Sequence, residues 1–302
     1  MAFTQPTSAP HCFIILAIIA FFIPGESYSF SSPDKSFQRT SHQLSRHIRY
    51  AYTIENRSPN VARDVHFWTY APVKVTPTQI CTKISSSNHY ELITDEYQNQ
   101  ILHYVFDFIP PYGSKRITVD VDLVFSKTPN QSSPDNLEEY LLPERFIECD
   151  NREIRTLAQQ LHKNHLMGTV ESIFHWIVEN MNSPGYLHNE RGALYALQNQ
   201  KGDCTEYMYL FVALCRTEGI PARCLGGYIC SQNSILKSNQ YHNWAEFYFQ
   251  GSWRIADPHK NTFLENHSDY VAFHVMKSSP ANPISGFSRF HVRGKGLHVW
   301  MD

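Results

Sequence analysis

Three residues in the second half of the chain have the side chains of a thiol nucleophile and its activating groups. Cys204 follows Gly202-Asp203, His242 is the second residue of YHNWAEFYF, and Asp257 ends SWRIAD. A thiol whose proton is taken by an imidazole, itself oriented by a carboxylate, can attack a carbonyl carbon and form a thioester. If folding brings the three together, they predict acyl transfer on amide or peptide carbonyls.

Cys204 is predicted to begin a helix. Asp203 can act as its N-cap, and Glu206 three residues later completes a capping-box pattern. Gly219 is placed to end the helix. The positive end of the helix dipole favours a thiolate, and the free N–H groups of the first turn can hold a developing oxyanion. Asp203 opposes the thiolate unless capping takes up its charge. An apolar stripe predicts that the helix is buried: Met208, Phe211, Val212 and Cys215.

His242 and Asp257 are predicted to lie on one face of a β-hairpin. With Gln250-Gly251 as a two-residue turn, Phe249 faces Ser252 and Asp257 faces Trp244. Because side chains alternate faces along a strand, His242 then lies diagonally beside Asp257, within reach of a carboxylate–imidazole hydrogen bond. A three-residue loop would instead place them on opposite faces.

With these residues in place, the chain resembles the transglutaminase-like superfamily in its bacterial, exported form. The family carries a G-x-C with the cysteine opening a helix, an L-R-x-x-G-I-P-A-R stretch and a G-Y strand. A histidine before a tryptophan and an acidic residue, and then a W-x-x-x-D-P-like strand, complete the pattern. The corresponding segments here are Gly202-Asp203-Cys204, LCRTEGIPAR from Leu214 to Arg223, Gly227-Tyr228, HNWAE from His242, and WRIADP from Trp253.

The resemblance implies a papain-like fold, with helices packed on an antiparallel sheet and Cys204, His242 and Asp257 as the triad. It also makes Trp176, on a helix before the cysteine, a candidate oxyanion partner, although an aromatic core residue fits that position as well. Arg223 and Tyr228 match motif positions and are interpreted as framework residues. Asn243 departs from the pattern, because a small residue is usual there.

The residues before this region predict an antiparallel β-sandwich over residues 40–127. Short segments rich in β-branched and aromatic residues alternate with turn clusters, as in ITVDVDLVF, where Ile117, Val119, Val121 and Leu123 share one face. The polar, proline-punctuated residues 128–136 suggest a boundary. Helical periodicity follows in NREIRTLAQQLHKN and TVESIFHWIVENM. We therefore expect an α+β chain, with a transglutaminase-like catalytic domain over residues 135–302.

Residues 1–29 have the features of a signal peptide. CFIILAIIAFFI is apolar from Cys12 to Ile23, and small residues at Ser27 and Ser29 allow cleavage before Phe30. The run is short for a membrane span, which needs about 20 residues, and no Lys or Arg precedes it. Periplasmic or secreted placement is expected, with two alternatives open: an uncleaved membrane anchor and a buried N-terminal helix.

Composition excludes several other kinds of partner. A formal net charge of −2 and the lack of basic runs argue against nucleic acid. No C-x-x-C pair is present, and no H-E-x-x-H or H-x-x-x-H spacing, so neither a metal nor another cofactor is expected. Cys215, Cys224 and Cys230 are interpreted as structural, and a Cys81–Cys149 disulfide remains open. A peptide or protein substrate is the expected partner; the oligomeric state is not predicted.

Two other functions compete with a thiol enzyme. A catalytically idle domain could bind peptide or cell-wall material, but the complete set of Cys204, His242 and Asp257 argues against it. A peptide N-glycanase shares the fold within the superfamily, but it typically brings upstream C-x-x-C zinc pairs, which this sequence lacks. For the leading function, the sequence leaves both acceptors open: water would make the protein a hydrolase, and a lysine amine a transamidase.

Overall fold

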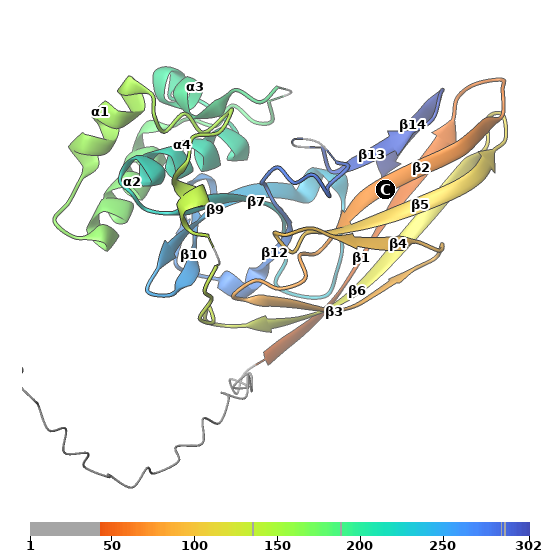
Figure 1. Cartoon of the computed structure of the whole chain (residues 1–302), viewed down its shortest axis with the longest axis horizontal. Helices are drawn as coiled ribbons and strands as arrows, with labels where there is room; N and C mark the ends of the chain where they lie inside the picture. Colours follow the sequence, from red (N-terminus) through yellow and green to blue (C-terminus); the bar gives the residue numbers. More distant parts are fainter. Residues whose placement is uncertain (1–42, 135, 188, 285, 287) are drawn as a thin grey trace, which may run out of the picture. The chain divides into compact units, whose positions relative to one another are not determined.

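The computed structural model describes residues 43–302 except residues 135, 188, 285 and 287. The predicted leader and its cleavage site lie outside the described residues. The described residues form one compact unit. Figure 1 shows that its helices gather at one end and its long strands at the other. Among the helices of the described part, none is both long and apolar enough to cross a bilayer.

The strands of the N-terminal half, in which apolar and polar side chains alternate, form two antiparallel sheets, as predicted. Their strands are β1 (Gln43–Asn56), β2 (Ala62–Ala71), β3 (Gln79–Ser86), β4 (Glu91–Thr94), β5 (Gln100–Ile109) and β6 (Ser114–Ser126). One sheet has the order β14-β1-β6-β3 and the other β13-β2-β5-β4. The inward residues of β6 are almost completely buried, which confirms the predicted alternation: Ile117, Val119, Val121 and Leu123.

The end of the chain returns to these two sheets. β13 (Phe290–Arg293) pairs with β2, and β14 (Leu297–Met301) pairs with β1, on which the short β8 (Ser234–Ile235) also lies. Residues 290–301 are therefore part of the N-terminal sheets, although they follow the helices in sequence. The domain limits proposed from the sequence remain predictions, but strand pairing ties the last segment to β1 and β2.

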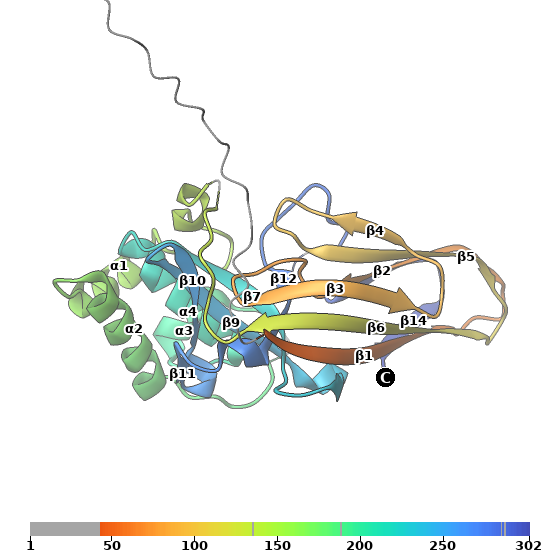
Figure 2. The same cartoon turned by 90° about the horizontal axis from the view of Figure 1, so that it is seen from below.

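A third antiparallel sheet, in the order β11-β10-β9-β7-β12, supports the helices. It consists of β7 (Ala222–Ile229), β9 (Tyr241–Phe249), β10 (Ser252–Asp257), β11 (Thr262–Phe263) and β12 (Tyr270–Val275). Figure 2, from below, shows its strands between the helices and the long strands of the other sheets. Short 3₁₀ turns connect these elements: Glu138–Leu141, Ser238–Gln240, Pro258–Lys260 and His267–Asp269.

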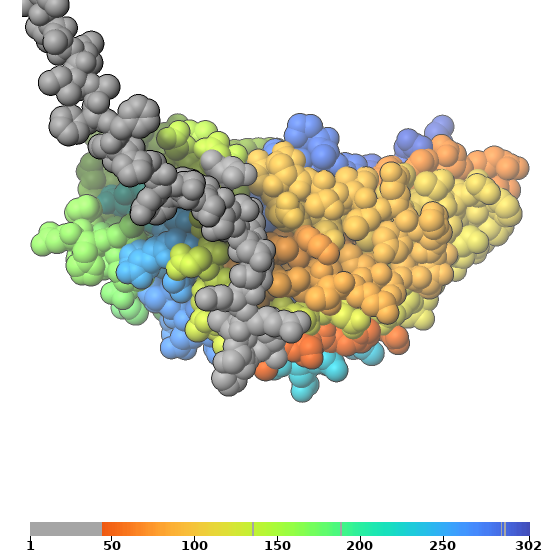
Figure 3. Space-filling view, turned by 60° about the horizontal axis from the view of Figure 1, so that its bottom comes forward, coloured from red at the N-terminus to blue at the C-terminus, as the bar shows by residue number. Residues whose placement is uncertain are grey.

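Four helices come before this sheet in the chain: α1 (Arg152–Leu161), α2 (Leu166–Asn180), α3 (Gly192–Asn199) and α4 (Cys204–Thr217). α4 lies in the middle, in contact with the other three helices and with β7 and β9. It is therefore buried from Glu206 to Arg216 on every side rather than along one stripe. The predicted α+β fold is confirmed. In the space-filling view of Figure 3, strand residues in orange and yellow form one half of the unit, and green helical residues lie in the other.

Candidate active site

Cys204 is the first residue of α4, as predicted. The Asp203 carboxylate accepts hydrogen bonds from the backbone N–H groups of Thr205 and Leu187, both at 2.9 Å. Glu206 in turn accepts from the Asp203 N–H at 3.0 Å, which completes the predicted capping box. The charge of Asp203 is thus engaged by two N–H groups beside the thiol. Cys204 itself is half-buried.

Gly202 lets the chain turn into α4 without a collision. A Cβ atom built on Gly202 would lie 2.3 Å from the Cβ of Glu206, closer than two carbon atoms can approach. The glycine of the G-x-C motif is therefore required because the capping glutamate folds back over it. Glu206 is buried, and burial is the main reason that its pKa is raised to about 7.

The β9–β10 hairpin has the predicted register. Gln250 and Gly251 form a two-residue turn with positive φ angles of 48° and 76°, and Ser252 pairs with Phe249. As a result, Nε2 of His242 lies 2.6 Å from Oδ2 of Asp257. Both side chains are buried, with 6% of His242 and 1% of Asp257 exposed.

Asp257 is fixed by two further hydrogen bonds. The Tyr270 hydroxyl donates to Oδ2 at 2.9 Å, and the backbone N–H of Lys260 donates to Oδ1 at 3.1 Å. A buried carboxylate with three donors is held in one orientation and compensated for its loss of water. The Lys260 contact follows from the Asp-Pro turn, but no pattern in the sequence identifies Tyr270 as a partner.

His242 also interacts with the Cys204 thiol. Burial lowers the pKa of His242 and is the largest single influence on it. Hydrogen bonds with Asp257 and with Cys204, and the charges of the same two groups, act in the opposite direction and raise the pKa to about 9. Because Nε2 is engaged by Asp257, Nδ1 is the ring nitrogen left for the thiol. The structure therefore brings Cys204, His242 and Asp257 together, and the arrangement can hold a thiolate beside an imidazolium.

Two neighbours of this group were not identified from the sequence. The Asn243 side chain donates from Nδ2 to the Thr205 hydroxyl at 3.0 Å, which joins the strand of the imidazole to the helix of the thiol. The ring of His259 lies 5.6 Å from that of His242, between centroids. Burial lowers the pKa of His259, as does the nearby His242 charge. The Asp-Pro-His sequence was the only signal for His259.

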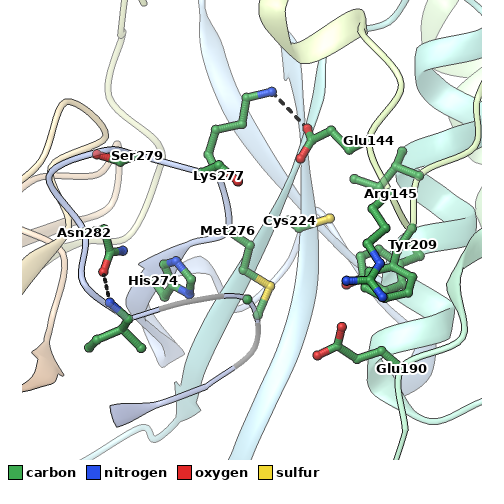
Figure 4. A pocket seen from close by; sticks show the side chains of 15 residues that line it. Glu144, Arg145, Glu190, Tyr209, Cys224, His274, Met276, Lys277, Ser279 and Asn282 are labelled. Carbon is green, nitrogen blue, oxygen red and sulfur yellow. Dashed lines mark hydrogen bonds and ion pairs between the residues drawn. The ribbon is translucent and has the colours of Figure 1, made fainter. Parts of the chain in front are cut away.

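A cavity of about 580 Å³ lies between α4 and the residues after β12, and none of Cys204, His242 or Asp257 lines it. Figure 4 shows Cys224 on its floor, Met276 and His274 on one wall and Tyr209 on the other, with the Lys277–Glu144 ion pair at its edge. Met276, on this wall, lies beside Gly226. The Tyr241 hydroxyl and the Met276 methyl group both lie within 3 Å of the point where a Gly226 Cβ would be.

Tyr241 lies near Gly226 and near Cys204. Burial is the main cause of the raised pKa of Tyr241, and Cys204 lies close enough for its charge to contribute. Tyr241 is thus near both the cavity wall and the thiol.

The other three residues singled out in the sequence, Trp176, Arg223 and Tyr228, make packing contacts or ion pairs within the fold. Trp176 is half-buried on α2 and packs against the helical core. Arg223 forms an ion pair with Glu246 at 2.6 Å and lies over the Trp253 ring. The Tyr228 side chain is buried and contacts Met301 on β14. These contacts agree with the framework interpretation of Arg223 and Tyr228, and no contact of Trp176 with the triad is among them.

The described cysteines are all free thiols, including Cys81 and Cys149. Cys81 belongs to the core of the N-terminal sheets and Cys149 to the helical core, so the disulfide left open by the sequence does not form. Cys215 and Cys224 are buried, and burial raises the pKa of each thiol. Within residues 43–302, apart from the four gaps, no group of three or more His, Cys, Asp or Glu side chains could hold a metal ion.

Comparisons with known proteins find similar sequences and structures. The family model described as the Transglutaminase-like superfamily matches residues 155–258. Over 151 residues the chain is 26% identical to the uncharacterized protein YebA of Bacillus subtilis (strain 168), an alignment that covers 41% of this chain and 20% of YebA. The chain thus spans about a fifth of the length of that relative.

One solved structure shares the fold, and a second is more distantly similar. A candidate cysteine protease from Cytophaga hutchinsonii superposes with a TM-score of 0.57 at 16% identity, over 86% of this chain and 92% of that one. The periplasmic domain of TgpA from Pseudomonas aeruginosa gives a TM-score of 0.40 at 14% identity, over 68% of this chain and 90% of that one. With the family match, the helix that begins at Cys204 and the hairpin beside it lead to one identification: residues 155–258 are a domain of the transglutaminase-like superfamily.

Proposed function

We propose that this protein is a thiol enzyme that transfers acyl groups from amide or peptide carbonyls, with Cys204 as nucleophile, His242 as base and Asp257 as the residue that orients the base. One observation carries the proposal: a buried His242–Asp257 hydrogen bond of 2.6 Å, whose imidazole also interacts with a thiol at a helix start. A surface histidine and a turn-forming aspartate would not need to be buried together.

The reaction follows from the roles of these groups. The thiolate of Cys204 attacks the carbonyl carbon, a C–S bond forms, and the carbonyl electron pair moves to oxygen. The backbone N–H of Cys204, at the start of α4, can stabilise that oxyanion. The C–N bond then breaks while the His242 imidazolium gives its proton to the leaving nitrogen. The thioester remains, with neutral His242 beside it.

Release of the acyl group reverses the proton transfer. His242 takes a proton from the acceptor, whose oxygen or nitrogen attacks the thioester carbon, and the C–S bond breaks to restore the thiolate and the imidazolium. Water as acceptor gives a carboxylic acid, which makes the protein a peptidase or amidase; a lysine amine gives a new amide. The predicted oxyanion role of Trp176 stays a prediction.

An active-site-directed peptide electrophile tests this function. We expect one molecule of probe per chain, bound to Cys204 and detected by intact mass and peptide mapping, and no labelling in Cys204→Ala or His242→Ala. Cys230→Ala is the matched control, because Cys230 is also half-buried and its pKa is influenced by Arg46, Ser234 and Asp269 rather than by a histidine. Undiminished turnover or labelling of Cys204→Ala, with its thermal unfolding unchanged, would reject the assignment.

The products decide between the two acceptors. Incubation of the protein with a peptide amide and a labelled primary amine distinguishes a free carboxylate from an incorporated amine. The fold relative from Cytophaga hutchinsonii, described as a candidate cysteine protease, favours water. A chain that binds peptides without any turnover would instead be the idle domain.

Export of the protein is part of the same proposal. The apolar run from Cys12 to Ile23 with small residues before Phe30 supports periplasmic or secreted placement. Cell fractionation, followed by N-terminal sequencing of the recovered protein, separates a cleaved leader from a retained anchor. Recovery of the uncleaved chain in the cytoplasm would refute this placement.

A further inference from the structure

One hydrogen bond joins the helix of the nucleophile to the strand of the base. Nδ2 of Asn243 donates to the Thr205 hydroxyl at 3.0 Å. Thr205 follows Cys204 in α4, and Asn243 follows His242 in β9. The bond therefore lies one residue away from each of the two side chains that must meet in the proposed chemistry, although 38 positions separate its partners along the chain.

The buried amide of Asn243 uses only one of its two polar atoms. Only 6% of the residue is exposed, and its Oδ1 has no hydrogen-bond partner among the described residues. Burying an unpaired amide oxygen costs free energy. A small apolar side chain would avoid that cost, but it could not donate to Thr205. The bond through Nδ2 is therefore the contact that accounts for an amide at this position.

The aromatic contact between α4 and β9 lies farther along both elements. The rings of Phe211 and Phe247 are 6.2 Å apart between centroids, within the helical core. Phe211 is about 10 Å along the helix from Cys204, at about 1.5 Å per residue. Phe247 is about 16 Å along the strand from His242, at about 3.3 Å per residue. Because apolar contact is not directional, this packing does not by itself fix the ends that carry the thiol and the imidazole.

Other hydrogen bonds at the start of α4 do not lead to β9. The two capping carboxylates accept from the backbone N–H groups of Leu187 and Arg191, which lie outside β9. In the part of the chain that the structure describes, α4 and β9 share one further side-chain hydrogen bond, the contact of His242 with the Cys204 thiol. The bond from Nδ2 is thus the directional link between the two elements that is independent of the reacting groups.

We propose that Asn243 is a positioning residue. Its hydrogen bond to Thr205 fixes the start of α4 on β9, and so sets how closely the thiol and the imidazole approach each other. The inference rests on the proposed function and deepens it, because it names what aligns the nucleophile with its base. A displacement of about 1 Å can cost about a hundredfold in rate when two groups must align to react. Asn243 stands where a small residue is usual in the family, so this means of alignment is a property of this chain.

Alkylation of Cys204 measures the proposed effect without any substrate. Its rate with iodoacetamide is followed from pH 5 to 9 in the wild type, Asn243→Ala and Thr205→Val. We expect both variants to react about tenfold more slowly than the wild type near neutral pH, the effect of one hydrogen bond. Near pH 9 the rates should converge, because a thiol without an imidazole partner ionises at higher pH. Profiles identical to that of the wild type in both variants would overturn the proposal.

Two further variants separate positioning from stability. Thr205→Ser keeps the hydroxyl that accepts from Nδ2, so it should restore the wild-type profile. Thr217→Val is the matched control at the other end of α4, because it removes a hydroxyl that donates to two backbone carbonyls at 2.8 and 2.9 Å. We expect it to lower the temperature of thermal unfolding and to leave alkylation of Cys204 unchanged. If Asn243→Ala behaved like Thr217→Val, the residue would be structural only and the proposal would fail.

The double variant shows whether the two residues act through one bond. If the Asn243 amide acts only through the Thr205 hydroxyl, Asn243→Ala combined with Thr205→Val should be no slower in alkylation than either single variant. A loss of about a hundredfold, the product of two separate tenfold losses, would show that they act independently and would contradict the proposal.

Turnover distinguishes a failure of this inference from a failure of the proposed function. On a peptide amide we expect Asn243→Ala to lower kcat about tenfold with KM unchanged, because contacts with the substrate remain while the reacting groups lose alignment. A rise in KM alone would refute positioning. If wild-type Cys204 reacts with iodoacetamide no faster than Cys230, the activated thiol is absent, and the proposed function fails together with this inference. Fast alkylation in the wild type and in Asn243→Ala alike rejects only the role of Asn243.

Discussion

Nε2 of His242 and Oδ2 of Asp257 are 2.6 Å apart, and both side chains are more than nine-tenths buried. The pair sits at the open end of the β9–β10 hairpin, where the turn at Gln250-Gly251 sets the strand register. Because Asp257 engages Nε2, the opposite ring nitrogen is presented to the thiol of Cys204. This single contact determines how the imidazole can act.

Asp257→Asn should lower kcat by about 10²–10⁴, because an amide can hold the imidazole in the wrong tautomer and cannot stabilise the imidazolium. Steady-state kinetics on a peptide amide measures the loss. Tyr270→Phe is the graded control: it removes one donor to Oδ2 and leaves the His242–Asp257 bond, so a drop of about tenfold or less is expected. A fully active Asp257→Asn protein would show that the carboxylate does not orient His242.

The stability of the protein should fall as pH rises from about 6.5 to 9. An unfolded histidine has a pKa near 6.5, whereas that of His242 is raised to about 9, so the folded state holds this proton more tightly in that window. The stabilisation is complete below pH 6.5 and is lost as pH passes 9, by up to about 3 kcal/mol. Urea unfolding at pH 6, 7.5 and 9 measures it.

The same unfolding experiment on Asp257→Asn provides the control. The variant lacks the carboxylate that raises the pKa of His242 through a hydrogen bond and through its charge. Its free energy of unfolding should therefore depend less on pH across this window than that of the wild type. Identical slopes in the two proteins would mean that other groups cause the pH dependence.

Iodoacetamide should alkylate Cys204 much faster than the other cysteines near pH 7. Cys215 and Cys224 are buried, and burial raises the pKa of their thiols, so they react slowly. Cys230 is the stricter comparison, since it is half-buried like Cys204 while burial also raises the pKa of its thiol. Peptide mapping over time gives the rates. Equal rates for Cys204 and Cys230 would count against activation by His242.

Gly202→Ala should destabilise the protein and reduce turnover together. Its new Cβ would meet the Cβ of Glu206 at 2.3 Å, so the start of α4 and the thiol must shift. Gly219→Ala is the matched control at the other end of the helix. Gly219 has a φ of 71° with no atom near its Cβ position, so alanine there costs about 1–2 kcal/mol of backbone strain. That variant should lose stability and keep kcat; a normal kcat in Gly202→Ala would contradict the steric argument.

Local patterns were sufficient to predict the elements of the site. The Asp203–Glu206 cap marks the start of α4, and Gly219 marks its end. The Gln250-Gly251 turn sets the register of β9 and β10. These features depend on hydrogen bonds and side-chain periodicity between near neighbours, so they can be predicted without the rest of the fold. The family resemblance then placed Cys204, His242 and Asp257 together, and the structure brings them into contact.

Contacts between distant segments were decided only by the tertiary structure. Tyr270 reaches Asp257 from another strand, and Asn243 reaches Thr205 across 38 residues, yet each is an ordinary residue within its own element. The return of β14 to β1 likewise joins residues about 250 positions apart along the chain. Such pairs depend on how whole sheets and helices pack, which no short window of sequence encodes. The sequence therefore determined which residues are proposed to carry the chemistry. The packing of α4 on the third sheet decided what surrounds them, because burial and hydrogen-bond partners exist only in the assembled core.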